Sequence, residues 1–143
     1  MTRTGRTQVE LNAEIVKLLF STLDLLRGHF GAAAAEAGLS GGPARALINI
    51  SEPTPMRHLA SDLACDPSNV TGIVDDLEQR GLVTREPDPG DRRIKLLVLT
   101  ARGRQVREEF MDRINRTVPG VSDLTDEQRR TLRDLLREVV ARR

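Results

Sequence analysis

Two short runs of polar residues carry side chains that could bind another molecule. The first run consists of Ser68, Asn69, Thr71 and Gly72. Its hydroxyl and amide groups can hydrogen-bond to base edges or phosphate oxygens, and its glycine lets the backbone approach a surface closely. The second is the pair Arg92-Arg93, whose guanidinium groups suit phosphate and the narrow minor groove of DNA. The chemistry that these residue types favour is nucleic-acid recognition.

The first run lies near the start of a predicted helix over residues 67–80. Asp66 followed by Pro67 is a typical helix start, because a polar N-cap precedes a proline at the first helical position. Apolar residues at i, i+3, i+4 and i+7 then predict one buried face, made of Val70, Ile73, Val74 and Leu77. Gly81 is expected to end the helix. The polar run is left on the opposite, exposed face.

A shorter helix is predicted just before it. Thr54 can act as its N-cap and Pro55 suits its first position. Leu59 and Leu63 lie four residues apart and predict its buried face. A tight turn over residues 64–66 joins the two helices. This arrangement is typical of a helix-turn-helix, whose second helix enters the major groove of DNA.

A β-hairpin is predicted after the two helices. Residues 82–85 and 94–99 are short and rich in β-branched and leucine side chains. The segment 86–91 between them has the proline, glycine and aspartate content of a turn. Arg92 and Arg93 follow at its tip, where an arginine can enter a narrow minor groove. We therefore expect a DNA-binding wing.

Two further residues of the hairpin receive specific expectations. Arg85 ends the first strand, and the sequence leaves open whether it contacts DNA or pairs with Glu86 or Asp88. Asp91 has the wrong charge to contact DNA, so we expect it to hold Arg93 in a fixed pose. The predicted DNA-contacting set is Ser68, Asn69, Thr71, Gly72, Arg85, Arg92 and Arg93.

The motifs in this region resemble those of the MarR family of winged helix-turn-helix regulators. The matching features are S-x-V-T at residues 68–71, V-D-x-L-E-x-x-G-L-V-x-R at 74–85, D-x-R at 91–93 and L-T-x-x-G at 99–103. Together they are specific, and a looser resemblance extends from about Val9 to Val140. One departure is Gly72, where the family often carries a basic residue.

The resemblance implies a dimeric repressor that is released from DNA by a small ligand, often aromatic or phenolic. It implies that the N-terminal helix joins the dimer interface and that the ligand pocket lies between the dimer helices and the DNA-binding lobe. The residues lining such a pocket cannot be identified from the sequence. Two-fold symmetry predicts a pseudo-palindromic DNA site with half-sites about 10 base pairs apart.

The predicted fold is mainly α with a small β-wing, in a single domain over residues 1–143. Residues 40–100 form the winged helix-turn-helix lobe, and residues 9–38 and 101–143 form N- and C-terminal dimerisation helices. Residues 1–8 are expected to be frayed. The last helix starts with a Thr125–Gln128 capping box and carries an apolar stripe of Leu132, Leu135, Leu136 and Val139. The outer helices carry more apolar surface than one small lobe can cover, so we infer a homodimer.

Composition excludes several other classes. The net charge is only +1, so DNA affinity must come from local clusters of basic residues rather than from the field of the whole protein. No apolar stretch is long enough to span a membrane, and no signal peptide is visible. The single cysteine, Cys65, excludes an internal disulfide and fits a reducing cytoplasm. No catalytic motif is present, so we expect neither an enzyme nor a cofactor.

Two residue types invite hypotheses that the pattern does not favour. Cys65 is expected to be a small buried side chain rather than a redox switch. His29 and His58 are far apart in the chain, and with one cysteine they supply too few ligands for a zinc site. Two alternatives to a ligand-responsive repressor stay open: a winged-helix module that binds a protein partner, and a DNA binder with no ligand response. A steep salt dependence of DNA binding would exclude the first.

Overall fold

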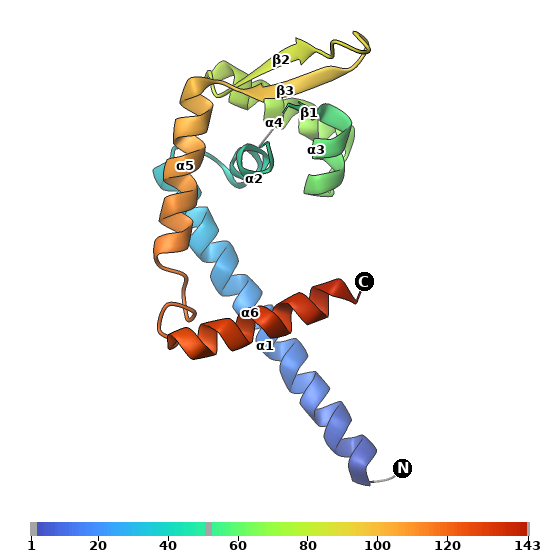
Figure 1. The fold of residues 1–143 in the computed structure, drawn as a ribbon, viewed down its shortest axis with the longest axis vertical. Helices are drawn as coiled ribbons and strands as arrows, with labels where there is room; N and C mark the ends of the chain where they lie inside the picture. Colours follow the sequence, from blue (N-terminus) through green and yellow to red (C-terminus); the bar gives the residue numbers. More distant parts are fainter. Residues whose placement is uncertain (1–2, 51–52, 143) are drawn as a thin grey trace. The chain divides into compact units, whose positions relative to one another are not determined.

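The computed structural model describes residues 3–50 and 53–142. Its elements, in chain order, are α1 (Arg3–Glu36), α2 (Gly41–Asn49), β1 (Thr54–Pro55), α3 (Met56–Leu63), α4 (Pro67–Gln79), β2 (Val83–Pro87), β3 (Lys95–Leu99), α5 (Ala101–Arg116) and α6 (Asp126–Ala141) (Figure 1). The predicted fold class is confirmed, because helices dominate and the strands form one small antiparallel sheet. Two compact units share the chain: Phe30–Asn115, and Met1–His29 together with Arg116–Arg143.

The sheet has three strands in the order β1-β3-β2, all antiparallel to their neighbours. The third strand, β1, was not predicted. Thr54 pairs with Leu97 of β3, so it is a strand residue and the prediction that it caps α3 was wrong. Pro55 is extended (φ −59°, ψ 137°) and is itself the N-cap, and α3 begins one residue later than expected. The sheet therefore reaches back to the start of the helix-turn-helix.

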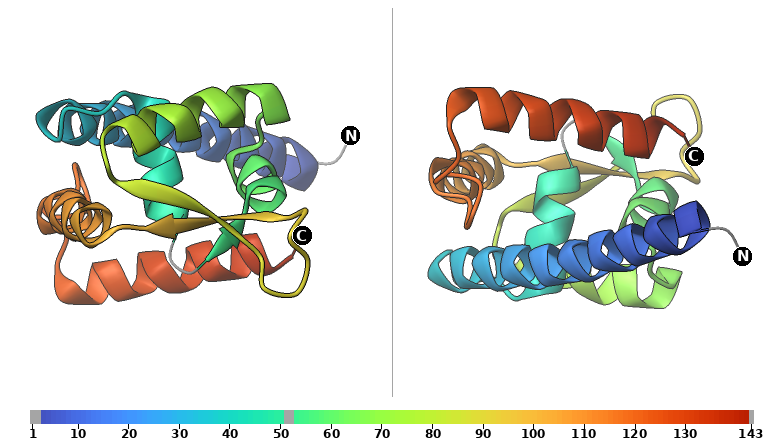
Figure 2. Two further views of the ribbon diagram at one scale, coloured as in Figure 1. Left: turned by 90° about the horizontal axis from the view of Figure 1, so that it is seen from above. Right: turned by 90° about the horizontal axis from the view of Figure 1, so that it is seen from below.

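The core of the Phe30–Asn115 unit is built from the apolar faces that the sequence indicates. Seen from above in Figure 2, α2 lies among α3, α4 and the sheet, and it contacts both helices. The largest fully buried side chains are Phe110, Leu47, Ile50, Leu59, Leu77, Leu97, Val70, Val74 and Val83. Leu59, Val70, Val74 and Leu77 confirm the predicted inward faces of the two helices. Burying each such side chain contributes roughly 1.5–3 kcal/mol.

The junction between β3 and α5 is tightly built. Thr100 caps α5: its Oγ1 accepts a hydrogen bond from the Gly103 N–H (2.9 Å) and donates one to the Gly81 carbonyl (2.7 Å). Gly103 is buried, and a Cβ placed on it would lie 1.9 Å from the carbonyl oxygen of Leu82. The close approach of α5 to the Leu82 backbone therefore requires glycine at this position.

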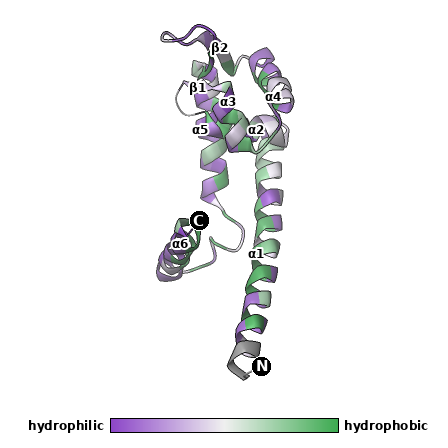
Figure 3. Ribbon diagram, turned by 90° about the vertical axis from the view of Figure 1, so that its right-hand side faces the viewer, coloured by the Kyte–Doolittle hydropathy of each residue, from purple (hydrophilic) through white to green (hydrophobic). Residues whose placement is uncertain are grey.

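The helices of the other unit expose their apolar side chains within a single chain. In α1 the exposed large hydrophobic residues are Val9, Leu11, Ile15, Val16, Leu18, Leu19, Phe20, Leu23, Leu25 and Leu26. In Figure 3 the hydrophobic colour recurs along α1. In α6 Leu135, Leu136, Val139 and Val140 are exposed, so one chain does not bury the stripe predicted there. The capping box of Thr125 and Gln128 is confirmed.

The start of α1 differs from the prediction, whereas its end agrees with it. The helix begins at Arg3, so the prediction that residues up to 8 fray was wrong for the part that the structure describes. Helix α1 ends at Glu36, and Gly38 follows with a φ of +70°, a left-handed conformation that suits a glycine stop. Across the described ranges, no helix is both long enough and apolar enough to cross a membrane.

Candidate DNA interface

Helix α4 presents the predicted polar residues on its exposed side. Ser68, Asn69, Thr71 and Gly72 are all exposed. The opposite face is buried, apart from the half-buried Ile73. Pro67 occupies the first turn as expected, but the Asp66 side chain makes no capping hydrogen bond, so it acts as N-cap through its backbone only. The burial of one face thus fixes which side chains of α4 another molecule can reach.

The polar residues of α4 keep their hydrogen-bonding capacity. The Thr71 Oγ1 donates to the Pro67 carbonyl (3.1 Å), which leaves its acceptor lone pairs available. Gly72 has open space around it, because a Cβ built there meets no atom within 4 Å. Packing within the chain therefore does not require glycine at this position. A surface this open allows another backbone to come close to α4.

The tip of the wing is held by two aspartates. The Asp88 Oδ1 accepts hydrogen bonds from the N–H groups of Gly90 (2.7 Å) and Asp91 (3.3 Å). The Asp91 Oδ1 accepts one from the N–H of Arg93 (3.0 Å), so the predicted contact is present but runs through the backbone. The side chains of Arg92 and Arg93 are exposed. Asp91 thus orders the tip without engaging the guanidinium group of Arg93.

Arg85 occupies a different environment from the one predicted. Its Nη2 donates to the Asp75 Oδ1 (2.5 Å) and its Nη1 donates to the Glu78 Oε2. Of the two alternatives left open by the sequence, pairing with Glu86 or Asp88 was wrong, because the partners are Asp75 and Glu78. Successive side chains on a strand point to opposite faces, and Arg85 projects from β2 toward α4, which contacts that strand. Only 23% of the Arg85 side-chain surface is exposed.

Each residue of the acidic pair in the middle of α4 is bound by an arginine. Asp75 pairs with Arg85, and Asp76 accepts from the Arg80 Nε at 3.0 Å to each carboxylate oxygen. Arg80 also donates from Nη1 to the Gly38 carbonyl (2.7 Å), which links the end of α4 to the turn after α1. Because Arg85 also pairs with Glu78, two arginines face three carboxylates here, and the negative charge of this part of α4 is reduced rather than cancelled.

Comparison with known proteins identifies the family. The sequence model of the MarR family matches residues 46–95. The HTH-type transcriptional regulator YcgE of Bacillus subtilis is 32% identical over 131 residues, covering 89% of this chain and 83% of YcgE. The chain belongs to the MarR family. Members of this family are DNA-binding transcriptional regulators.

Solved structures agree with this assignment. A MarR family transcriptional regulator from Rhodococcus sp. RHA1 shares 30% identity and a TM-score of 0.73, covering 90% of this chain and 95% of that one. CouR from Rhodococcus jostii RHA1, solved bound to p-coumaroyl-CoA, shares 31% identity and a TM-score of 0.68, covering 90% and 93%. The two helices α3 and α4 with the β2-β3 hairpin are thus the winged helix-turn-helix of a MarR regulator.

In this MarR regulator the structure sorts the predicted DNA-contacting residues into three places. Four lie exposed on α4, two lie exposed at the wing tip, and Arg85 lies between α4 and the wing. One feature of the sequence could have indicated the partners of Arg85: Asp75 and Glu78 are three residues apart and therefore share a helix face. The link from Arg80 to Gly38 spans 42 positions and had no local signal.

Cys65 is less buried than predicted, although it packs against the core. The Cys65 side chain is half-buried and its Sγ donates to the Leu63 carbonyl (3.3 Å), which fits a packed side chain in the turn before α4. Within residues 3–50 and 53–142, no group of three or more His, Cys, Asp or Glu side chains could hold a metal ion.

Asn69→Ala is expected to change which DNA sequences the protein prefers. The Asn69 side chain is exposed in the first turn of α4, where an amide can bond an adenine edge with two hydrogen bonds. We expect the preference at one or two positions of each half-site to relax by about 1–3 kcal/mol. Selection from a random duplex pool by both proteins measures this. An equal loss of affinity across all sequences would make Asn69 a phosphate contact instead.

Proposed function

We propose that this protein is a homodimeric repressor that occludes a promoter and leaves DNA when a small molecule binds. The observation that carries the proposal is the division of α4 into a buried apolar face and an exposed polar face, in a MarR-family chain whose wing exposes two arginines. We assign Ser68, Asn69, Thr71 and Gly72 to the major groove. We assign Arg93 to the flanking minor groove and Arg92 to a phosphate.

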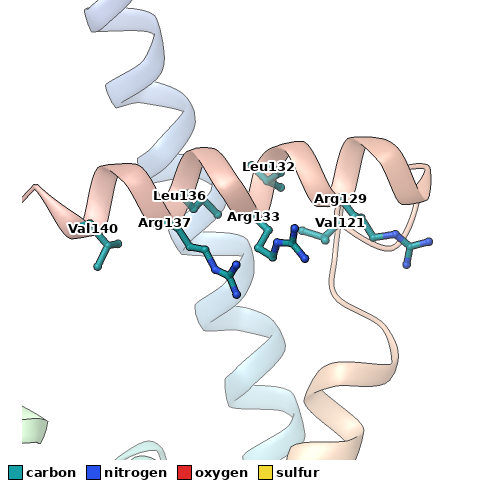
Figure 4. Close-up of a pocket in the computed structure, with 8 residues that line it drawn as sticks. Val121, Arg129, Leu132, Arg133, Leu136, Arg137 and Val140 are labelled. Atoms are coloured by element: carbon teal, nitrogen blue, oxygen red, sulfur yellow. The ribbon is translucent and has the colours of Figure 1, made fainter.

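The exposed apolar side chains of α1 and α6 support the dimer. On α6 they border a groove of about 710 Å³ (Figure 4). One part of it is lined by Arg129, Arg133 and Arg137, and its apolar lining is Val121, Leu132, Leu136, Val140 and Ala141. An apolar surface of this extent is not expected to face water in a stable monomer. A second copy of the chain would cover it, as the family's dimeric DNA binding requires.

Leu136→Gln is expected to weaken the dimer by roughly 10- to 100-fold. Leu136 is 44% exposed in the single chain, and a two-fold interface contains every substitution twice. Light scattering after size exclusion over a range of concentrations measures the shift toward monomer. Glu138→Gln, an exposed polar residue of the same helix, is the matched control and should leave the mass unchanged. Equal dimer stability in both variants would exclude α6 from the interface.

The ligand part of the proposal is supported by one relative. CouR, which is similar over 90% of this chain, was solved bound to p-coumaroyl-CoA, whose acyl group is phenolic. We propose that this protein also responds to a small aromatic or phenolic molecule. Such a ligand would release DNA by binding more tightly to dimers whose two α4 helices are spaced wrongly for neighbouring major grooves.

Selection from a random duplex DNA pool at near-physiological salt tests the proposal. We expect an inverted repeat with half-sites about 10 base pairs apart, bound with a steep salt dependence. The selected duplex then serves as the probe for a panel of aromatic acids and their thioesters. A folded dimer that enriches no sequence would favour the partner-binding alternative. A duplex that no compound of the panel releases would favour a DNA binder without a ligand response.

A further inference from the structure

The contact between Arg85 and helix α4 joins the two parts of the DNA-binding surface. Arg85 lies in β2, the strand that leads to the wing tip, and its two partners lie one helical turn apart on α4. The planar guanidinium group can engage two carboxylates at once in fixed directions, which an ammonium group cannot do. Figure 1 shows β2 beside α4, and the two elements are in contact.

We infer that Arg85, Asp75 and Glu78 form a clamp that sets the position of the wing relative to the recognition helix and thereby determines which flanking DNA sequences the wing accepts. In this role Arg85 is a positioning residue that does not itself touch DNA. The inference rests on the proposed contacts of α4 and the wing with DNA.

The covered position of Arg85 supports a positioning role. Its side chain is 23% exposed, whereas Arg92 and Arg93 are exposed residues at the tip. Both of its terminal nitrogens are occupied by carboxylates. Burial alone would lower the pKa of Arg85, but the hydrogen bond to Asp75 and the charges of Glu78 and Asp75 raise it above its usual value. The guanidinium group therefore stays charged and paired.

The base of the wing is also tied to α4 by apolar packing, because Val83 and Leu97 share the buried core with Val74 and Leu77. The β2-β3 ladder connects the wing strands to each other, and the tip is ordered by Asp88 and Asp91, which belong to the wing itself. Farther along β2, the clamp adds two ion pairs that cross from this strand to α4. A surface ion pair adds little stability, so its larger consequence is geometric: it restricts the angle at which the hairpin leaves the lobe.

Two variants that change the charge in opposite directions distinguish a clamp from a direct contact between Arg85 and DNA. Arg85→Gln removes one positive charge, and Asp75→Asn/Glu78→Gln removes two negative charges, yet both break the clamp. We expect both to reduce discrimination between flanking sequences by about 10-fold while preference in the half-site core is retained. Affinities for a library with fixed half-sites and randomised flanks measure this. Arg113→Gln, which breaks the Arg113–Glu36 pair elsewhere in the same unit, is the matched control and should change neither preference.

The salt dependence and hydrogen exchange complete the test. If Arg85 positions the wing, the slope of log affinity against log salt stays unchanged in Arg85→Gln; a slope reduced by about one would show a phosphate contact and overturn the clamp. Flank discrimination that survives in Asp75→Asn/Glu78→Gln would also overturn it. Faster amide exchange over residues 83–95 is expected in both clamp variants without any DNA, and unchanged exchange would reject the clamp even if wild-type protein bound no duplex. Absence of DNA binding by the wild type would reject the proposed function alone.

Discussion

Gly103→Ala is expected to destabilise the fold by about 3 kcal/mol, at the upper end of what overpacking costs. The added Cβ would lie 1.9 Å from the Leu82 carbonyl oxygen, and a backbone atom cannot move aside as a flexible side chain can. That oxygen also accepts the N–H of Thr100 (3.0 Å), so displacing it strains the cap of α5 as well. Chemical denaturation at a fixed protein concentration measures the effect, because dimer stability depends on concentration.

Gly72→Ala is the control, and the two substitutions are expected to have opposite signs. Both glycines lie in helices, where alanine is normally favoured by roughly 0.5–1 kcal/mol. A Cβ at Gly72 meets nothing within 4 Å, so that variant should gain stability. If both variants were stabilised, the close approach of α5 to Leu82 would not be a constraint on the fold.

Helix α4 was predictable because its signals are local and repeated. The apolar spacing of Val70, Val74 and Leu77, the start at Pro67 and the stop at Gly81 all agree with one another. Agreement between start, period and stop makes an element readable from sequence. The capping box of α6 was predictable because its signal is equally local.

Strand β1 was not predictable, because a strand of two residues is defined by its partner. The dipeptide Thr54-Pro55 is compatible with two structures: an N-cap followed by the first residue of a helix, or a short strand at the edge of a sheet. The pairing of Thr54 with Leu97 decided between them, and that contact links positions far apart in the chain. Pro55 suits an edge strand because its nitrogen carries no hydrogen and cannot donate a hydrogen bond to a neighbouring strand.

The partners of Arg85 were missed for a related reason. The sequence offered Glu86 and Asp88 as neighbouring acids, but the alternation of a strand places Glu86 on the other face from Arg85. The Asp88 carboxylate is used by the N–H groups of the turn. Only the packing of α4 against β2 brings its carboxylates to Arg85, so the candidate site required tertiary structure at this one position.

The apolar stripes of α1 and α6 show a different limit. The stripe of α6 was predicted from its spacing, yet Leu136 and its neighbours are exposed within one chain. A period in the sequence predicts that a face is apolar, but burial of that face requires a partner surface. The Phe30–Asn115 unit has its own buried core, whereas α1 and α6 expose their apolar side chains, and this exposure is the observation on which the proposed dimer rests.

Arg93→Ala is expected to weaken binding to the selected duplex by about 1–3 kcal/mol, which is roughly 5- to 150-fold. Its side chain is exposed at the wing tip, and the hydrogen bond from its N–H to Asp91 fixes the backbone that carries it. An arginine gains most where the minor groove is narrow and its potential most negative. The loss should therefore be largest on duplexes with A·T-rich flanks, as measured by fluorescence anisotropy at fixed salt.

Arg102→Ala is the matched control for Arg93→Ala. Arg102 is an exposed arginine of the same unit and lies in the first turn of α5. It follows the C-terminal end of β3, whereas the wing tip precedes the N-terminal end of that strand. Its loss removes the same charge, so it reports the effect of net charge alone. If the wing enters the minor groove, Arg93→Ala loses the preference for A·T-rich flanks and Arg102→Ala keeps it. Equal, flank-independent losses in the two variants would reduce the role of the wing to general electrostatic attraction, since only a side chain inside the groove can sense its width.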